Sequence, residues 1–187
     1  SAVTLAILKG ILAPIVGENV NYVNASLIAA ERGVKVIEAK ASRMEEFANL
    51  LALDVRGDSS TSLGVVPSDP PTFVGGKSRD DGKSLTLQGT LSARREPRIV
   101  KIDRYFVEAT PEGYMLILKN QDRPGLIGQL GTLLGESQIN IASMSNGRDK
   151  PGGTAITVVN IDNHVPPQVL DAVKKLRYVL DAKLIKL

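Results

Sequence analysis

Residues 119–144 read KNQDRPGLIGQLGTLLGESQINIASM, and this stretch decides the fold of the second half of the chain. The apolar residues of Leu126–Leu134 recur three and four positions apart, which is typical of a helix with one buried face. The spacing predicts an α-helix over 126–136. Strand-like runs flank it on both sides, at 114–119 and at 140–145.

The elements downstream extend this pattern to the end of the chain. In order, we expect strand 114–119, turn 120–125, helix 126–136, strand 140–145, a hairpin turn over 147–153, strand 154–161, a helix opened by Pro166 or Pro167, and strand 178–185. This order is βαββαβ, a ferredoxin-like unit. Two helices on one face of such a sheet leave its other face, or its edge strands, in need of a partner.

The first half predicts a second unit with an antiparallel sheet. Helical patterns cover 3–16 and 25–32, and Gly33 is expected to end the second helix in a left-handed conformation. Strand-like runs follow at 34–39, 47–55, 85–91, 98–102 and 105–109. Residues 57–83 are rich in Gly, Ser, Pro and Asp, which predicts a wide, flexible excursion between two strands. We therefore expect an α+β protein of two small domains, 1–112 and 113–187.

Composition excludes several classes of function. The 187 residues include no cysteine and one histidine, which excludes disulfides, a thiol nucleophile and a Cys- or His-rich metal site. Aromatic residues make up 4% and the net charge is +3, which does not favour nucleic-acid binding. The longest apolar stretch, 5–16, is interrupted by Lys9, Gly10 and Pro14 and does not suit a membrane span. We expect a soluble cytoplasmic protein, with an organelle as the alternative.

One basic run stands out, at 93–104, with five Lys or Arg against two acidic residues. Side chains alternate along a strand, so Arg98 and Arg104 would share a face if the strand were regular. Together with Lys101 they form a candidate cradle for a carboxylate or phosphate. A solvated basic face is the alternative, and the sequence leaves both open.

The turn before the central helix suits an amino-acid ligand. A zwitterionic amino acid needs a carboxylate for its ammonium group and N–H donors for its carboxylate. Asp122 supplies the first, and the helix start near 123–126 supplies free N–H groups and the positive end of a helix dipole. Asn140 can both donate and accept. Asp122 equally suits a helix cap and Asn140 a turn, so binding and structural roles stay open.

The same residues resemble a known family. Residues 119–144 resemble the signature of an ACT domain, the small-molecule sensor of amino-acid metabolism, and more narrowly the ACT domain of D-3-phosphoglycerate dehydrogenase. Upstream segments resemble the intervening (allosteric substrate-binding) domain of that enzyme, at 8–12, 20–25, 30–34, 88–91 and 96–102. The resemblance covers nearly the whole chain apart from 57–83.

The resemblance implies a regulatory region of serine biosynthesis that binds L-serine as feedback effector. Asn120, Asp122 and Asn140 fall on the family's serine-contacting positions, and the turn would complete the effector site with Arg123, Pro124, Gly125, Leu126 and Ile127. Arg98 falls on a basic position of the family's proposed anion site, with Lys101 and Arg104 nearby. ACT units of the family pair with the ligand at their junction, so the expected partners are L-serine and a second copy of the chain, through both domains.

The catalytic signature of the family is not among these residues. That half carries a Gly-x-Gly-x-x-Gly nucleotide fold and an Arg, a Glu and a His for hydride transfer. We therefore expect a non-catalytic C-terminal fragment, incomplete at its N-terminus, with Ser1 not a natural start. No cofactor is expected here, and NAD would belong to the absent catalytic domains. The alternatives are a regulatory part of an L-serine dehydratase, or an oligomerisation module without a ligand.

Overall fold

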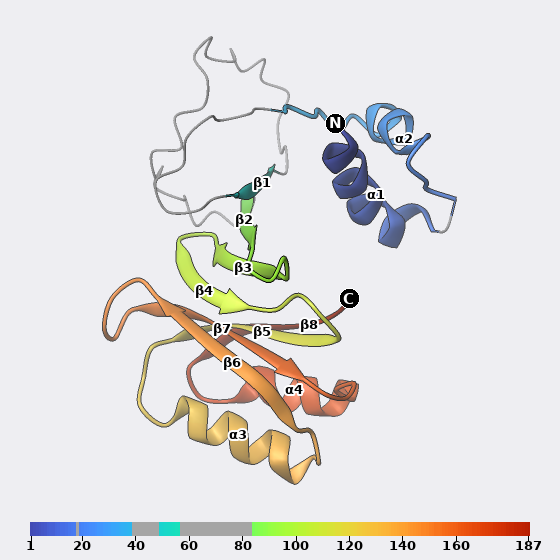
Figure 1. Cartoon of the computed structure of the whole chain (residues 1–187). Coiled ribbons are helices and arrows are strands. Elements are labelled where there is room, and N and C mark those ends of the chain that lie inside the picture. The colour runs from blue at the N-terminus through green and yellow to red at the C-terminus, as the bar shows by residue number, and fades with distance from the viewer. Residues whose placement is uncertain (18, 39–48, 57–83) are drawn as a thin grey trace. The chain divides into compact units, whose positions relative to one another are not determined.

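The computed structural model describes residues 1–17, 19–38, 49–56 and 84–187 (Figure 1). These residues fall into two compact units. The first contains the described residues up to 38, and the second contains 49–56 and 84–187. The expected excursion over 57–83 lies outside the described residues.

The first unit is built on two helices, α1 (Ala2–Val16) and α2 (Ala25–Glu31), as predicted. Gly33 follows α2 with a φ of 71°, which is the left-handed conformation expected of it. A small buried cluster joins the helices and contains Leu8, Leu12, Val20, Ala25 and Ala29.

The strand predicted over 34–39 was wrong for its described part. Residues 34–38 have no strand structure, and residue 39 lies outside the described residues. Their apolar alternation satisfies a strand pattern, but a strand also needs a neighbour for its backbone N–H and C=O groups. No strand among the described residues pairs with this segment.

The second unit opens with an antiparallel sheet in the order β1-β2-β3-β4. Its strands are β1 (Leu51–Arg56), β2 (Ser84–Leu91), β3 (Pro97–Ile102) and β4 (Tyr105–Ala109). Three of the four match the predicted strands to within a residue at each end. The strand expected over 47–55 begins at Leu51 instead, and residues 47–48 lie outside the described part of the chain.

The remainder is the predicted βαββαβ unit. It consists of β5 (Tyr114–Gln121), α3 (Leu126–Glu136), β6 (Ile141–Arg148), β7 (Thr154–Ile161), α4 (Pro167–Lys175) and β8 (Val179–Lys186). The strand order is β6-β7-β5-β8, and every adjacent pair is antiparallel. Pro167 is the first residue of α4, where its missing N–H is not needed. The α+β fold expected from the sequence is confirmed.

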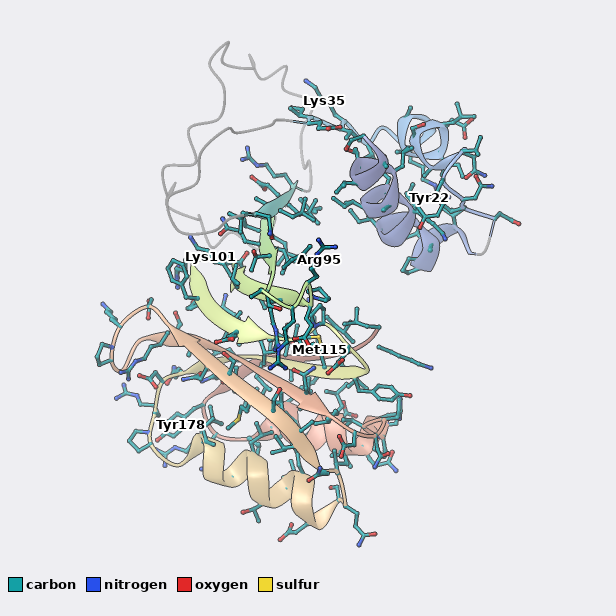
Figure 2. The ribbon with its side chains drawn as sticks, viewed as in Figure 1. Tyr22, Lys35, Arg95, Lys101, Met115 and Tyr178 are labelled. Atoms are coloured by element: carbon teal, nitrogen blue, oxygen red, sulfur yellow. The ribbon has the colours of Figure 1, made fainter. Side chains whose placement is uncertain are left out.

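The central strands of this second sheet, β5 and β7, are packed on both faces. On one face, α3 and α4 cover a core that includes Leu116, Leu118 and Val159. On the other face lies β4, whose Tyr105, Val107 and Ala109 join Met115 and Val158 in a second core. Figure 1 shows β4 on the side of the sheet opposite α3, and Figure 2 shows Met115 of β5 where β4 lies against the sheet. The partner that the sequence required for the open face is therefore β4.

The approach of β4 to the sheet is closest at Gly147 of β6. A Cβ atom placed on Gly147 would overlap the backbone carbonyl of Phe106 and crowd Val107. Next to it, the backbone N–H of Glu108 donates to the Ser145 hydroxyl oxygen at 2.8 Å. A residue without a side chain is therefore required where the two strands cross.

Gly147→Ala should lower the free energy of unfolding by about 1–3 kcal/mol, because overpacking a filled core costs this much. Gly135→Ala is the matched control, since Gly135 lies on an exposed part of α3 with open space around its Cβ position. That control should gain about 0.5–1 kcal/mol from improved helix propensity. Chemical denaturation followed by circular dichroism measures both values, and a Gly147→Ala protein as stable as the parent would contradict the packing of β4 on β6.

Candidate functional site

The turn between β5 and α3 leads into a helix whose first N–H groups have no side-chain cap among the described residues. The N-cap of α3 is Gly125, with a φ of 89°, and no side chain from the described residues caps the helix. Pro124 precedes the helix instead of lying in its first turn. Of the two roles left open for Asp122, the helix cap is not the one it has, because α3 begins at Leu126 with Gly125 as its N-cap. Those N–H groups remain available to a ligand.

Asp122 instead contacts the hairpin that joins β6 to β7. Its Oδ2 accepts hydrogen bonds from Arg148 Nη1 at 3.0 Å and from the backbone N–H of Gly152 at 3.2 Å. Its own backbone N–H donates to the carbonyl of Gly153 at 2.8 Å. The Arg148 hydrogen bond, followed by the Gly152 N–H, lowers the pKa of the Asp122 carboxyl below its usual value of 3.8. The turn thus holds an ionised carboxylate at its base.

Asn120 lies beneath the turn and is 2% exposed. Its Oδ1 accepts from the Thr157 hydroxyl at 2.9 Å, and its Nδ2 donates to the Gln121 carbonyl at 3.1 Å. The Thr157 hydroxyl is also 2.9 Å from Oδ1 of Asn146, an exposed residue of the edge strand β6. Asn120, Thr157 and Asn146 form a polar row across three adjacent strands that leads from the buried amide to the surface.

Asn140 does not join this group within one chain. The strand register pairs Asn120 with Ala155, and Ala155 with Arg148, at one end of the sheet. Asn140 precedes Ile141 at the opposite end, where its Nδ2 donates to Asp162 Oδ2 at 2.7 Å. Arg148 lies eight positions after Asn140, which corresponds to roughly 26 Å along the strand at about 3.3 Å per residue.

The other predicted effector residues lie in the turn and in the first turn of α3. Arg123, Pro124, Gly125 and Ile127 are exposed, whereas Leu126 is buried. On its far side the turn is flanked by the loop before β8, where the Tyr178 carbonyl accepts from the Gln121 backbone N–H at 2.9 Å. Tyr178 lies on this side of the molecule in Figure 2. The turn is thus fixed from two directions, by this loop and by the 149–153 hairpin.

The regular strand that would have put Arg98 and Arg104 on one face is interrupted. The chain reverses at Asp103, whose φ is 52°, so β3 ends at Ile102 and Arg104 lies in the turn just before β4. Arg98 donates to Thr110 Oγ1 at 2.6 Å and pairs with Glu96 at 2.9 Å. Lys101 Nζ lies 4.8 Å from the centre of the Phe106 ring. Arg104 donates to the hydroxyl groups of Tyr105 and Thr154.

Sequence reasoning missed four residues that surround Asp122 and Asn120. Arg148, Gly152, Asn146 and Thr157 follow the turn by more than twenty positions and reach it only through strand pairing. One signal was present in the sequence. Asn146 and Arg148 alternate with Ser145 and Gly147, and a polar pair on the helix-facing side of a strand is unusual unless it serves a site.

Among the described residues, no group of three or more His, Cys, Asp or Glu side chains is arranged to hold a metal ion. No helix in this part of the chain is long and apolar enough to cross a membrane.

Residues 114–178 match the ACT domain family, which is the unit that carries the Asp122 turn. Residues 1–69 match the D-3-phosphoglycerate dehydrogenase intervening domain. The chain is therefore an intervening domain followed by an ACT domain, and it corresponds to the C-terminal region of D-3-phosphoglycerate dehydrogenase homologues. The resemblance noted in the sequence is confirmed.

Individual relatives agree over nearly the whole chain. D-3-phosphoglycerate dehydrogenase of Archaeoglobus fulgidus is 36% identical over 99% of this chain and 31% of its own length. The enzyme of Bacillus subtilis is 31% identical over 100% of this chain and 31% of its own length. D-3-phosphoglycerate dehydrogenase 3, chloroplastic, of Arabidopsis thaliana is 25% identical over 97% of this chain and 29% of its own length. The chain spans just under a third of these relatives.

The ion pair of Asp122 predicts a specific pH dependence of stability. Because the folded-state pKa is lowered, the contribution of this carboxylate is complete above its usual pKa of 3.8 and is lost as the pH falls below that value. The stability difference between the parent and Asp122→Asn should therefore shrink on acidification. Arg148→Gln removes the main partner and should give the same convergence in urea titrations. A difference in the free energy of unfolding between parent and variants that stays constant as the pH falls below 3.8 would contradict the ion pair.

Proposed function

We propose that this chain is the effector-binding regulatory region of a D-3-phosphoglycerate dehydrogenase and that it binds L-serine as a feedback effector. The observation that carries the proposal is the ionised Asp122 carboxylate beside the uncapped N-terminus of α3. The intervening domain followed by the ACT domain supports the dehydrogenase over an L-serine dehydratase. Oxidation of the substrate, with its NAD, would belong to catalytic domains outside this chain.

The charges of the turn suit a small α-amino acid. The ligand's ammonium group would share the Asp122 carboxylate, which accepts only through Oδ2 in the contacts described above. Its carboxylate would face the free N–H groups and the positive dipole end of α3, with Arg148 nearby. The exposed residues Arg123, Pro124 and Ile127 would line the site. A zwitterion keeps this charge arrangement balanced, whereas a simple amine or a simple acid does not.

The position of Asn140 implies that a second copy completes the site. The outer edge of β6 pairs with no strand among the described residues. If two copies pair antiparallel along β6 about a two-fold axis, the Ile141 end of one strand lies against the Arg148 end of the other. Asn140 of a second copy would then stand beside Asp122 and Arg148. The ligand would bind the paired arrangement better and stabilise it, which is the coupling that feedback control requires.

The proposed anion site is confined to Arg98. This residue borders a cavity of about 580 Å³, which is also lined by Thr90, Ser92, Phe106 and Glu108. Its guanidinium is already engaged by Thr110 and Glu96. Unchanged anion affinity after Arg98→Ala would remove this part of the proposal.

Isothermal titration of L-serine into the purified chain should give saturable heat. Asp122→Ala should weaken binding by about 10- to 100-fold, because a hydrogen bond to a charged group contributes about 1.5–3 kcal/mol. Asp171→Ala, which removes an exposed carboxylate from α4, is the control and should leave the affinity unchanged. If the parent chain gives no saturable heat with L-serine, serine is not its effector. A panel of other amino acids then decides whether the turn senses any of them.

A further inference from the structure

The hairpin over residues 149–153 holds the candidate turn on one side. Gly152 donates its backbone N–H to Asp122 Oδ2, and the Gly153 carbonyl accepts from the backbone N–H of Asp122. These two contacts set the position of the carboxylate relative to α3. The position of the hairpin therefore sets the geometry of the candidate effector site.

The base of the same hairpin is fastened from outside the βαββαβ unit. Arg104, in the turn just before β4, donates through Nη2 to Thr154 Oγ1 at 2.9 Å and to the Tyr105 hydroxyl at 2.8 Å. The Tyr105 and Thr154 hydroxyl oxygens lie 2.7 Å apart. The same Nη2 is 3.8 Å from Asp149 Oδ2. One guanidinium group thus contacts the first residue of the hairpin, Asp149, and the first residue of β7, Thr154.

The hairpin is tight enough to transmit this restraint. The Asp149 backbone N–H donates to the Thr154 carbonyl at 3.2 Å, and the Gly153 N–H donates to the Lys150 carbonyl at 3.0 Å. A Cβ atom on Gly153 would overlap the Asp149 carboxylate, so the loop closes on its own side chains. Tyr105 is 3% exposed and packed in the core between β4 and the second sheet, which anchors the other end.

We propose that Arg104, supported by Tyr105, is a positioning residue of the amino-acid site. It fixes the base of the hairpin, and the hairpin in turn holds Asp122 in the orientation that receives the ligand's ammonium group. This inference rests on the proposed function and extends it to a residue that the sequence assigned to an anion site. A site whose groups are held in place before binding spends less free energy on ordering them, so loss of Arg104 weakens the ligand.

The same contacts provide a physical connection between the ligand and the first sheet. By reciprocity, an amino acid that binds better to the ordered hairpin also stabilises the Arg104 contacts and the β3–β4 turn. The connection consists of three consecutive steps, from Arg104 to Thr154 and Asp149, through the 149–153 hairpin, to Asp122.

The first test measures how strongly the hydrogen bonds of the hairpin are protected from exchange when no ligand is present. Amide hydrogen exchange, followed by NMR on the full 187-residue chain, reports the N–H groups of Asp122 and Gly152 directly. Arg104→Met should speed exchange at both amides by about fivefold or more, as expected when a local hydrogen bond is released. Tyr105→Phe keeps the buried ring and should give a smaller change of the same sign. Arg94→Met removes an exposed arginine from the turn between β2 and β3, and it should change neither amide.

The second test measures L-serine affinity by calorimetry on the same proteins. Arg104→Met should weaken binding by about 5- to 20-fold, because a less ordered hairpin weakens the charged hydrogen bond between the Asp122 carboxylate and the ligand's ammonium group. Arg104→Lys should restore part of the affinity, since an ammonium group can reach Asp149 but cannot bridge three acceptors as a guanidinium does. Arg94→Met should bind as the parent does.

The outcomes separate this inference from the proposed function. Unchanged exchange at Asp122 and Gly152 in Arg104→Met would overturn the positioning role, whether or not serine binds. Faster exchange with unchanged serine affinity would also overturn it. If the parent chain binds no L-serine, the proposed function fails, and the exchange measurement alone then decides whether Arg104 positions Asp122.

Discussion

The two central strands of the second sheet, β5 and β7, are packed on both faces, and the other features of the second unit depend on this double burial. Every residue of β7 after Thr154 is buried, with helices on one side and β4 on the other. Shifting such a strand by one residue would exchange the two sets of side chains between two different cores, so its register is strongly specified. The register of β7 then fixes which ends of β5 and β6 lie together.

This register separates the polar groups of the sheet into two ends. Asn120, Asp122 and Arg148 gather at the end where β5 leads into α3, whereas Asn140 lies at the other end beside Asp162. A single chain thus holds one acidic group, one basic group and the free N–H groups of a helix N-terminus at one place. The remaining predicted contact would come across the open edge of β6. In the proposed arrangement, binding of a small amino acid and pairing of two chains would be one event.

Much of this fold could be predicted because its signals are local. The helical spacing of Leu126–Leu134 and the strand expected over 154–161 match α3 and β7 in the structure. The failures all involve partners that are distant in sequence. Residues 34–38 alternate like a strand but pair with none of the described strands, and the reversal at Asp103 separates Arg98 from Arg104. Nothing local to β4 indicates that it covers another sheet, apart from its strict alternation of buried and exposed residues.

The candidate site was predicted in part for the same reason. The turn and its carboxylate follow from the sequence, but the role of Asp122 depends on Arg148, Gly152 and Gly153, which only the hairpin brings to it. An aspartate ahead of a helix satisfies the sequence rule for a cap, and the structure shows how a competing partner changes its use. The contacts of Arg104 could not be predicted for the same reason, because its hydrogen bond to Thr154 joins residues fifty positions apart in the sequence.

Mixed assembly of two defective chains tests the shared site most directly. Asp122→Ala and Asn140→Ala chains, each expected to bind serine weakly by itself, would be mixed, unfolded and refolded together before calorimetric titration, and sites with the parent's affinity would be counted. If each site takes Asp122 from one chain and Asn140 from the other, half the dimers are mixed and one of their two sites is intact. About one quarter of the parent's binding capacity should then return. No recovery in a mixture shown by mass spectrometry to contain mixed dimers would contradict a site completed by a second copy.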